Sequence, residues 1–248
     1  MKPSLALAGI VALAAISGCN SKPGNPKPSA PAKLEQVEPP KGGDWTMVVN
    51  AMPDGGFMMG NPNARVKLLE MGSLTCPHCK AFDDEGAPTL VSKYVKSGQV
   101  SWEFRNYVRD PFDLAAALVV RCNGSKTFFP LMRGIYNDQA AWVGKIQAAS
   151  QDQLQKLSNL PPSQQFVQMA GVAGLQDWAA ARGVPQAKSN QCLANQSGIN
   201  QLVQMTSDTT AQFPDFQGTP TFAINGSQVK DAATWDKLEP ELKKALGG

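Results

Sequence analysis

Four consecutive residues, Cys76-Pro77-His78-Cys79, carry the clearest chemistry in this 248-residue sequence. Two cysteines separated by two residues can close a small disulfide or supply half of a zinc site. A zinc site needs four nitrogen or sulfur ligands, whereas His78 is the only histidine in the sequence and no second Cys-x-x-Cys occurs. The pattern therefore favours a redox-active disulfide between Cys76 and Cys79, with no metal and no cofactor.

The residues on either side of this motif place it between a strand and a helix. The apolar run 66–71 predicts a buried strand, and a helical pattern follows from Lys80 to about Lys96. Cys76 would then lie near the N-terminus of that helix. Free backbone N–H groups and the positive end of the helix dipole stabilise a thiolate at this position.

Each residue of the motif has a separate expected role. We expect Cys76 to be the exposed nucleophile and Cys79 to be the buried resolving thiol. Pro77 suits the first helical turn because it needs no N–H partner there. We expect His78 to donate a hydrogen bond to the Cys76 sulfur or to pair with its charge.

Cys-Pro-His-Cys after a strand resembles the active site of the DsbA-type thiol:disulfide oxidoreductases, in the thioredoxin superfamily. Glu70 stands six residues before Cys76, at the place where this family carries a buried acid. The resemblance implies that Glu70 relays a proton to Cys79. The alternative is a glutamate at a strand edge that is paired with a lysine.

A third match lies near the C-terminus. The segment 218–222, Gly-Thr-Pro-Thr-Phe, resembles the cis-proline loop of the family. The resemblance implies that Thr219 and Pro220 pack against the disulfide and bind the substrate backbone. A proline after Gly-Thr is also common in ordinary loops, and Thr219, in place of the valine of some oxidants, resembles isomerases and reductases as well.

The resemblance covers about residue 44 to the C-terminus and implies the α/β class: a thioredoxin fold with an inserted all-helical domain. We expect the thioredoxin-like parts to span 44–109 and 213–248. The segment 110–212, rich in helical patterns, would be the insertion. Within the first part, 45–49 and 100–108 are typical of strands.

The first residues have the composition of an export signal. In the segment 1–19, Lys2 is followed by an apolar stretch of about a dozen residues, too short to span a bilayer. Its end, Ile-Ser-Gly-Cys, resembles a bacterial lipobox, in which Cys19 would be lipidated; the alternative is an ordinary signal peptide. The Pro-rich segment 20–43 predicts a disordered linker.

Export also accounts for the other cysteines. If Cys19 is lipidated or removed, Cys122 and Cys192 remain beside the redox pair. An oxidising compartment permits a structural disulfide between them, and DsbA relatives with a second disulfide have cysteines at similar places. The alternative is two buried free thiols.

Composition excludes other classes of function. The net charge is only +3, and no basic cluster is interleaved with aromatic residues, so nucleic acid is not an expected partner. No glycine-rich phosphate loop and no nucleophile elbow occur.

The predicted activity is donation of the Cys76–Cys79 disulfide to exported proteins with free thiols, through a mixed disulfide at Cys76. We expect a monomer in the periplasm or cell envelope, touching the membrane only through a lipid at Cys19. A membrane oxidase of the DsbB or VKOR type would reoxidise it. The alternatives are a reductase or isomerase on the same fold, and a metallochaperone that holds metal through the two thiols.

Overall fold

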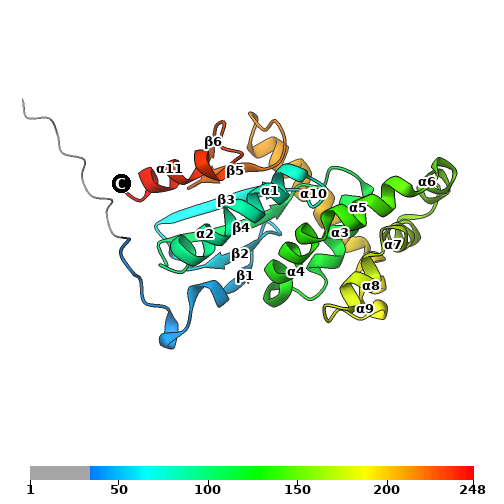
Figure 1. Ribbon diagram of the computed structural model, residues 1–248, viewed down its shortest axis with the longest axis horizontal. Helices are drawn as coiled ribbons and strands as arrows, with labels where there is room; N and C mark the ends of the chain where they lie inside the picture. The colour runs from blue at the N-terminus through cyan, green and yellow to red at the C-terminus, as the bar shows by residue number, and fades with distance from the viewer. Residues whose placement is uncertain (1–33) are drawn as a thin grey trace, which may run out of the picture. The chain divides into compact units, whose positions relative to one another are not determined.

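The computed structural model describes residues 34–248, which form a mixed α/β fold around a six-stranded sheet (Figure 1). The strands lie in the order β1-β2-β4-β3-β5-β6, and β3 pairs with β4 in parallel while the other pairs are antiparallel. Their bounds are β1 Val49–Ala51, β2 Phe57–Gly60, β3 Val66–Gly72, β4 Val100–Asn106, β5 Thr221–Ile224 and β6 Ser227–Val229.

The parallel pair β3 and β4 lies at the centre of the sheet. On one face of β4 Trp102 and Phe104 are fully buried, while the opposite face carries polar side chains, Ser101, Glu103 and Arg105. Burying one such ring stabilises the fold by roughly 2–3 kcal/mol. Because β3 ends at Gly72, the residues that follow it emerge at the carboxyl end of a central strand.

The connection from β3 to β4 is helical but is not one continuous helix. It consists of α1 Pro77–Glu85, the short α2 Ala87–Thr89 and a π-helical turn, η3 Leu90–Val95. The single helix predicted from Lys80 to about Lys96 is therefore wrong in detail. The structure breaks it at Gly86, which caps α1 and precedes Pro88 in the first turn of α2.

A helical insertion lies between β4 and β5, as predicted, on one side of the sheet in Figure 1. Its first helix, α3, begins after the cap residue Asp110 with a proline and is buried along almost its whole length. The helices are α3 Pro111–Arg121, α4 Ser125–Asn137, α5 Gln139–Ala148, α6 Gln151–Ser158, α7 Pro162–Ala173, α8 Leu175–Ala180, α9 Gln186–Leu193 and α10 Gln196–Gln212.

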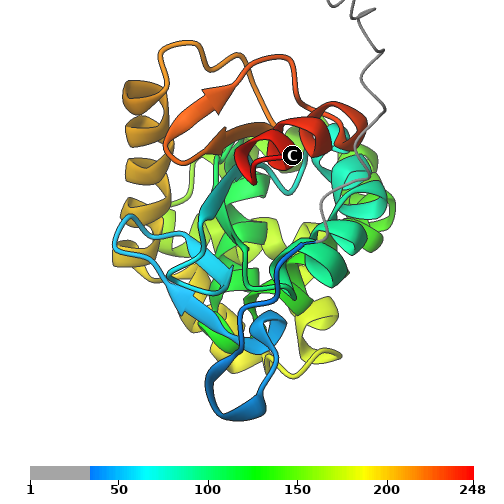
Figure 2. The same cartoon turned by 90° about the vertical axis from the view of Figure 1, so that its left-hand side faces the viewer.

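After the insertion the chain returns to the sheet through β5 and β6 and ends in α11, Trp235–Ala245. Figure 2 shows α11 beside the helices that follow β3. The Phe82 ring of α1 packs against Phe222 of β5, with centroids 4.6 Å apart, and against Trp235 of α11 at 6.3 Å. These aromatic contacts pack α1 against β5 and α11.

The N-terminal part of the described chain differs from the prediction. Residues 45–49 were expected to form a strand, but Trp45–Met47 form a 3₁₀ turn, η2, because Asp44 accepts a hydrogen bond from the Thr46 amide. The strand β1 begins only at Val49.

The end of the predicted linker also contacts the fold, where a short 3₁₀ turn, η1, spans Pro40–Gly42. The Val37 amide donates to Ser97 O at 2.9 Å, and the Trp45 indole donates to Val37 O at 2.8 Å. Leu34 and Val37 therefore contact the fold, while most residues of 34–43 are exposed. The rest of the linker, the predicted signal and Cys19 lie outside the described residues.

Candidate active site

Cys76 occupies the N-cap position of α1, directly before Pro77, as the flanking patterns predicted. Its pKa is lowered to about 4, first by a hydrogen bond from the Cys79 thiol, then by the Thr219 side chain and by the backbone N–H groups of Cys79 and His78. Burial acts in the opposite direction. At neutral pH the reduced site therefore holds its negative charge on Cys76.

Cys79 lies one turn further along α1 and is completely buried. Burial raises the pKa of the Cys79 thiol well above its ordinary value, and its hydrogen bond to Cys76 raises it further. The Ser73 amide donates to Cys79 Sγ at 3.5 Å and opposes this effect. The two thiols are thus strongly unequal: one is a ready thiolate and the other stays protonated.

Two expectations about the motif need correction. Cys76 was predicted to be exposed, but only 3% of it is accessible, because the loop before β5 covers it. His78 is exposed on α1, and its backbone N–H, not its imidazole, is the group that stabilises the Cys76 thiolate. Among the hydrogen bonds described for residues 34–248, none joins the imidazole to Cys76.

The Thr219–Pro220 peptide bond is cis and lies against the thiols, as the loop pattern indicated. The Thr219 carbonyl oxygen is 3.1 Å from Cys76 Sγ, and accepts a hydrogen bond from the protonated thiol. These residues are 143 positions apart in sequence and are joined through the fold. The side chain of the same threonine lowers the pKa of Cys76.

Glu70 is buried in β3, with 1% of its surface exposed. Burial raises its pKa well above the ordinary value, and the negative charge of Asp83 adds to this effect. The Trp102 indole donates to Glu70 Oε2 at 3.1 Å. No lysine pairs with Glu70 among the described residues, so the alternative of a strand-edge ion pair is wrong.

Asp83 is a buried acid that the sequence analysis missed. It is 2% exposed, lies four residues after Cys79 on the same face of α1, and approaches Arg133 Nε at 3.6 Å. Burial raises its pKa to about 6. The spacing of four within the predicted helix was the signal that could have identified it.

The helical insertion supplies further groups that the sequence analysis missed. Asp113 of α3, Tyr136 of α4 and Gln139 of α5 all bond to the loop between β3 and α1. Gln139 Nε2 donates to Leu74 O at 2.8 Å and to Cys76 O at 3.0 Å. Nothing in the local patterns around these residues indicates a contact with a loop at least 35 positions away.

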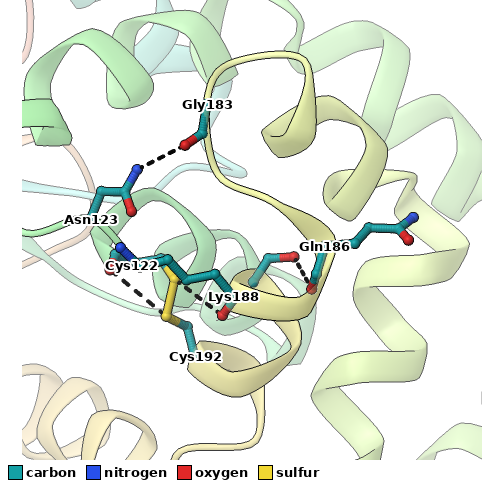
Figure 3. The surroundings of a disulfide bond; sticks show 7 residues. Cys122, Asn123, Gly183, Gln186, Lys188 and Cys192 are labelled. Atoms are coloured by element: carbon teal, nitrogen blue, oxygen red, sulfur yellow. Dashed lines mark hydrogen bonds between the residues drawn. A yellow bond between two sulfur atoms is a disulfide. The ribbon is translucent and has the colours of Figure 1, made fainter.

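The second cysteine pair is a disulfide. Cys122 and Cys192 are bonded across a sequence separation of 70, with Cα atoms 5.7 Å apart, and link the end of α3 to α9 (Figure 3). Beside it, Asn123 Nδ2 donates to Gly183 O at 3.3 Å. The prediction of this pair is confirmed, and the alternative of two free thiols is wrong.

No helix within 34–248 is long and apolar enough to cross a membrane. Over the same range, no group of three or more histidine, cysteine, aspartate and glutamate side chains has an arrangement that could hold a metal ion.

A low-pKa thiol at the start of the first helix of such a sheet, facing a cis-proline, defines a site for thiol–disulfide exchange of the thioredoxin type. The family model described as "Thioredoxin" matches residues 53–244. The chain belongs to this superfamily and, within it, to the DsbA-like protein-disulfide oxidoreductases.

Solved structures agree with this assignment. A protein-disulfide isomerase from Novosphingobium aromaticivorans is 31% identical, with a TM-score of 0.75, over 79% of this chain and 100% of that one. The alpha-DsbA1 of Wolbachia pipientis is 21% identical with a TM-score of 0.63, over 79% of this chain and 92% of that one. The second likeness supports the fold alone, and confirms the predicted thioredoxin-like sheet with a helical insertion.

Curated relatives agree as well. A provisionally named protein-disulfide oxidoreductase of Rickettsia prowazekii is 27% identical over 81% of this chain, and the match spans 65% of that relative's length. Disulfide bond formation protein D of Bacillus subtilis is 22% identical over 78% of each chain.

Proposed function

We propose that this protein donates the Cys76–Cys79 disulfide to thiols of exported proteins. The observation that carries the proposal is the pKa of Cys76, which is lowered to about 4. A site that stabilises its thiolate stabilises its reduced form, so its disulfide is easily transferred to another protein. Strong oxidants of this superfamily have a nucleophile pKa of about 3.5 and a potential of about −120 mV, whereas reductants have values of about 7 and about −270 mV.

The proposed reaction has two exchange steps. A substrate thiolate attacks Cys76 Sγ, the Cys76–Cys79 bond breaks, and Cys79 leaves as a thiolate that takes up a proton. A second substrate thiolate then attacks the substrate sulfur of the mixed disulfide, and Cys76 leaves as a stable thiolate. The substrate has lost two electrons and two thiol protons, and the cysteine pair has gained the two electrons.

Thr219 and Pro220 are the proposed contact for the substrate. The cis bond places the Thr219 backbone beside the Cys76 sulfur, where an extended peptide can pair with it as an added strand. A surface hollow continues from this loop, lined among others by Gly218, Gln228 and Lys230. Backbone pairing requires no particular side chain, which suits an enzyme that acts on many exported proteins.

The proposed compartment is the periplasm or cell envelope. The Cys122–Cys192 disulfide supports it, because such bonds persist in oxidising compartments. The leader 1–19, with lipidation of Cys19, supports export and a lipid anchor. A membrane oxidase of the DsbB or VKOR type would then accept the two electrons from a monomer of this protein, with no cofactor of its own.

The redox equilibrium of the protein in glutathione buffers tests the direction of transfer. Free thiols are trapped at each ratio with a mass tag, so that each cysteine pair is counted separately. A midpoint near about −120 mV is expected for a disulfide donor. A midpoint near about −270 mV would identify a reductase instead.

The second candidate is a disulfide isomerase or reductase at the same site. Two observations favour it: the relative from Novosphingobium aromaticivorans is named a protein-disulfide isomerase, and the residue before the cis-proline is Thr219. In an isomerase, the reduced nucleophilic cysteine attacks a non-native disulfide of the substrate and is later released when the substrate forms another disulfide. Repair of a scrambled substrate by the reduced protein, without added oxidant, would favour this candidate.

We further propose that Glu70 transfers the proton to and from Cys79. Both groups are buried, and negative charge on Glu70 raises the pKa of Cys79. Glu70→Gln is expected to slow the step that makes or breaks the Cys76–Cys79 bond, with a smaller solvent isotope effect. Glu103→Gln, on the neighbouring strand where Glu103 binds Arg105, is the control. Unchanged exchange kinetics in Glu70→Gln would refute the relay.

A further inference from the structure

The Ser73 amide is placed to stabilise charge on Cys79. Its nitrogen lies 3.5 Å from Cys79 Sγ, and the sulfur is completely buried. Cys79 carries negative charge only briefly, as it leaves or attacks the Cys76 sulfur, and a buried thiolate without a donor is costly. The direction of this amide therefore matters in the exchange step.

Asp113 of α3 binds both the side chain of Ser73 and the peptide N–H that follows it. Its Oδ2 accepts from Ser73 Oγ at 2.7 Å and from the Arg109 amide at 2.9 Å, and its Oδ1 accepts from the Leu74 amide at 2.9 Å. Asp113 is 1% exposed, and both of its oxygens are used. Burial of this carboxyl is costly unless such donors offset it, so the arrangement fixes the loop.

A second group from the insertion holds the same residue from its other side. The Tyr136 hydroxyl donates to Ser73 O at 3.1 Å, and Tyr136 is completely buried. The side chain and the carbonyl of Ser73 are thus both bound by helices of the insertion. Its N–H is left to bond with Cys79.

We propose that Asp113 is a positioning residue that aims the Ser73 N–H at the Cys79 sulfur during exchange. This inference rests on the proposed thiol–disulfide exchange, in either direction of transfer. When a thiolate attacks Cys76, the electrons of the Cys76–Cys79 bond pass to Cys79, and the aimed N–H stabilises them. When the bond forms again, the same contact stabilises the attacking Cys79 thiolate. The helical insertion thereby takes part in the chemistry of the thioredoxin-like part.

The experiment follows two steps of one reaction separately. The fully reduced protein is mixed with a symmetrical nitrobenzoate disulfide, whose released thiolate is coloured. Attack by Cys76 releases the first thiolate, and closure of the disulfide by Cys79 releases the second. In Asp113→Asn an amide NH₂ replaces one of the two acceptors, so the loop loses at least one bond.

We expect this variant to slow the second release and leave the first unchanged. Loss of a charge-assisted hydrogen bond lowers the thiolate fraction of Cys79 by about tenfold. The greater nucleophilicity of a more basic thiolate restores about threefold of this, so the second release slows by at least about threefold. A purely structural role would lower stability without separating the two steps.

Asp110→Asn is the matched control. Asp110 caps the same helix through the Phe112 and Asp113 amides and contacts Thr75, but not Ser73 or Leu74. Asparagine also caps helices, so both releases should keep the wild-type rate. Ser73→Ala removes the bond to Asp113 while keeping the amide, and it must slow the same second step even if Asp113→Asn fails to fold.

The outcomes separate this inference from the proposed function. Wild-type protein that releases only one thiolate contradicts internal exchange itself. Two releases in the wild type, with the second unchanged in Asp113→Asn or Ser73→Ala, overturn only the role of Asp113. Equal slowing of both releases also overturns it, because it indicates a general disturbance of the site.

Discussion

Cys122 and Cys192 are bonded to each other across 70 residues, whereas Cys76 and Cys79 stand two residues apart as free thiols at the start of one helix. The distant pair closes a long loop within the helical insertion. The near pair closes only a very short loop, so its bond removes little conformational entropy from the unfolded chain and stabilises the fold little.

The polar groups around the two cysteine pairs also differ. Around Cys76, a thiol, a threonine side chain and two backbone N–H groups favour the thiolate. Cys122 and Cys192 each have a carbonyl oxygen beside their sulfur, with Lys188 O 3.4 Å from Cys122 Sγ (Figure 3). A carbonyl oxygen, Thr219 O, also lies 3.1 Å from Cys76 Sγ, so the difference lies in the donors that surround Cys76 and favour its thiolate. These donors favour exchange at the Cys76–Cys79 pair.

The largest expected effect separates the pairs by activity. Cys76→Ser should abolish disulfide exchange, because a hydroxyl cannot form the mixed disulfide. Replacing both Cys122 and Cys192 by serine should leave exchange at the near pair intact. Trapping of a mixed disulfide with a model peptide measures this. A double variant without exchange would show that the two pairs act as one electron relay.

The next effect concerns stability. Removing the Cys122–Cys192 bond should lower the free energy of unfolding by about 4 kcal/mol, the loop-closure value for a separation of 70. Urea unfolding of the double alanine variant, with both near thiols reduced, measures the loss. Closing the Cys76–Cys79 bond should stabilise the protein far less, or destabilise it. If the near pair proved the more stabilising bond, the proposed division of roles would be wrong.

These contrasts also show which features a sequence can reveal. The Cys-x-x-Cys motif and the loop at Pro220 depend on residue types at short spacing, so both could be identified from the sequence. The exposure of Cys76 depends instead on a loop that lies 143 residues further along the chain. Its burial could not be deduced from the four residues of the motif.

The missed polar groups follow the same logic. Asp83 lies within the predicted helix at a spacing of four from Cys79, so a helical projection would have found it. Asp113 and Tyr136 reach Ser73 only because α3 and α4 pack beside the loop. Their partners are determined by tertiary packing. In the sequence, Asp113 is only an acidic residue in the first turn of a helix, which is a common and uninformative position.

A third prediction uses pH. Between about pH 4 and about pH 8.5 the folded reduced protein holds a Cys76 thiolate, whereas the unfolded chain holds a thiol. The unfolded state then binds more protons, so the stability of the reduced form rises with pH and is lost as the pH falls through about 4. The slope is at most about 1.4 kcal/mol per pH unit.

The oxidised form is the reference for this measurement. It lacks the thiolate, while the buried acid Asp113 is present in both forms and cancels in the difference. Glu70 adds to the difference, because the Cys76 charge raises its pKa only in the reduced form. Unfolding of both forms at several pH values gives the difference directly. The double serine variant of Cys122 and Cys192 should show the same dependence. A difference that is flat between about pH 5 and about pH 8 would mean that Cys76 is not a thiolate there.

The smallest expected effect separates the two contacts that Thr219 makes with Cys76. Thr219→Val keeps the shape of the side chain and the carbonyl, but removes the hydroxyl that stabilises the thiolate. The pKa of Cys76 should rise by about one pH unit or less, because Cys79 and the backbone N–H groups remain. Thiolate absorbance against pH measures the change.

Thr221→Val is the control, since the Thr221 hydroxyl donates to Gly218 O at 2.6 Å in the same loop. If both variants raise the pKa equally, the shape of the loop rather than the Thr219 hydroxyl stabilises the charge. The low pKa of Cys76 would then depend on Cys79 and the backbone N–H groups at the start of α1.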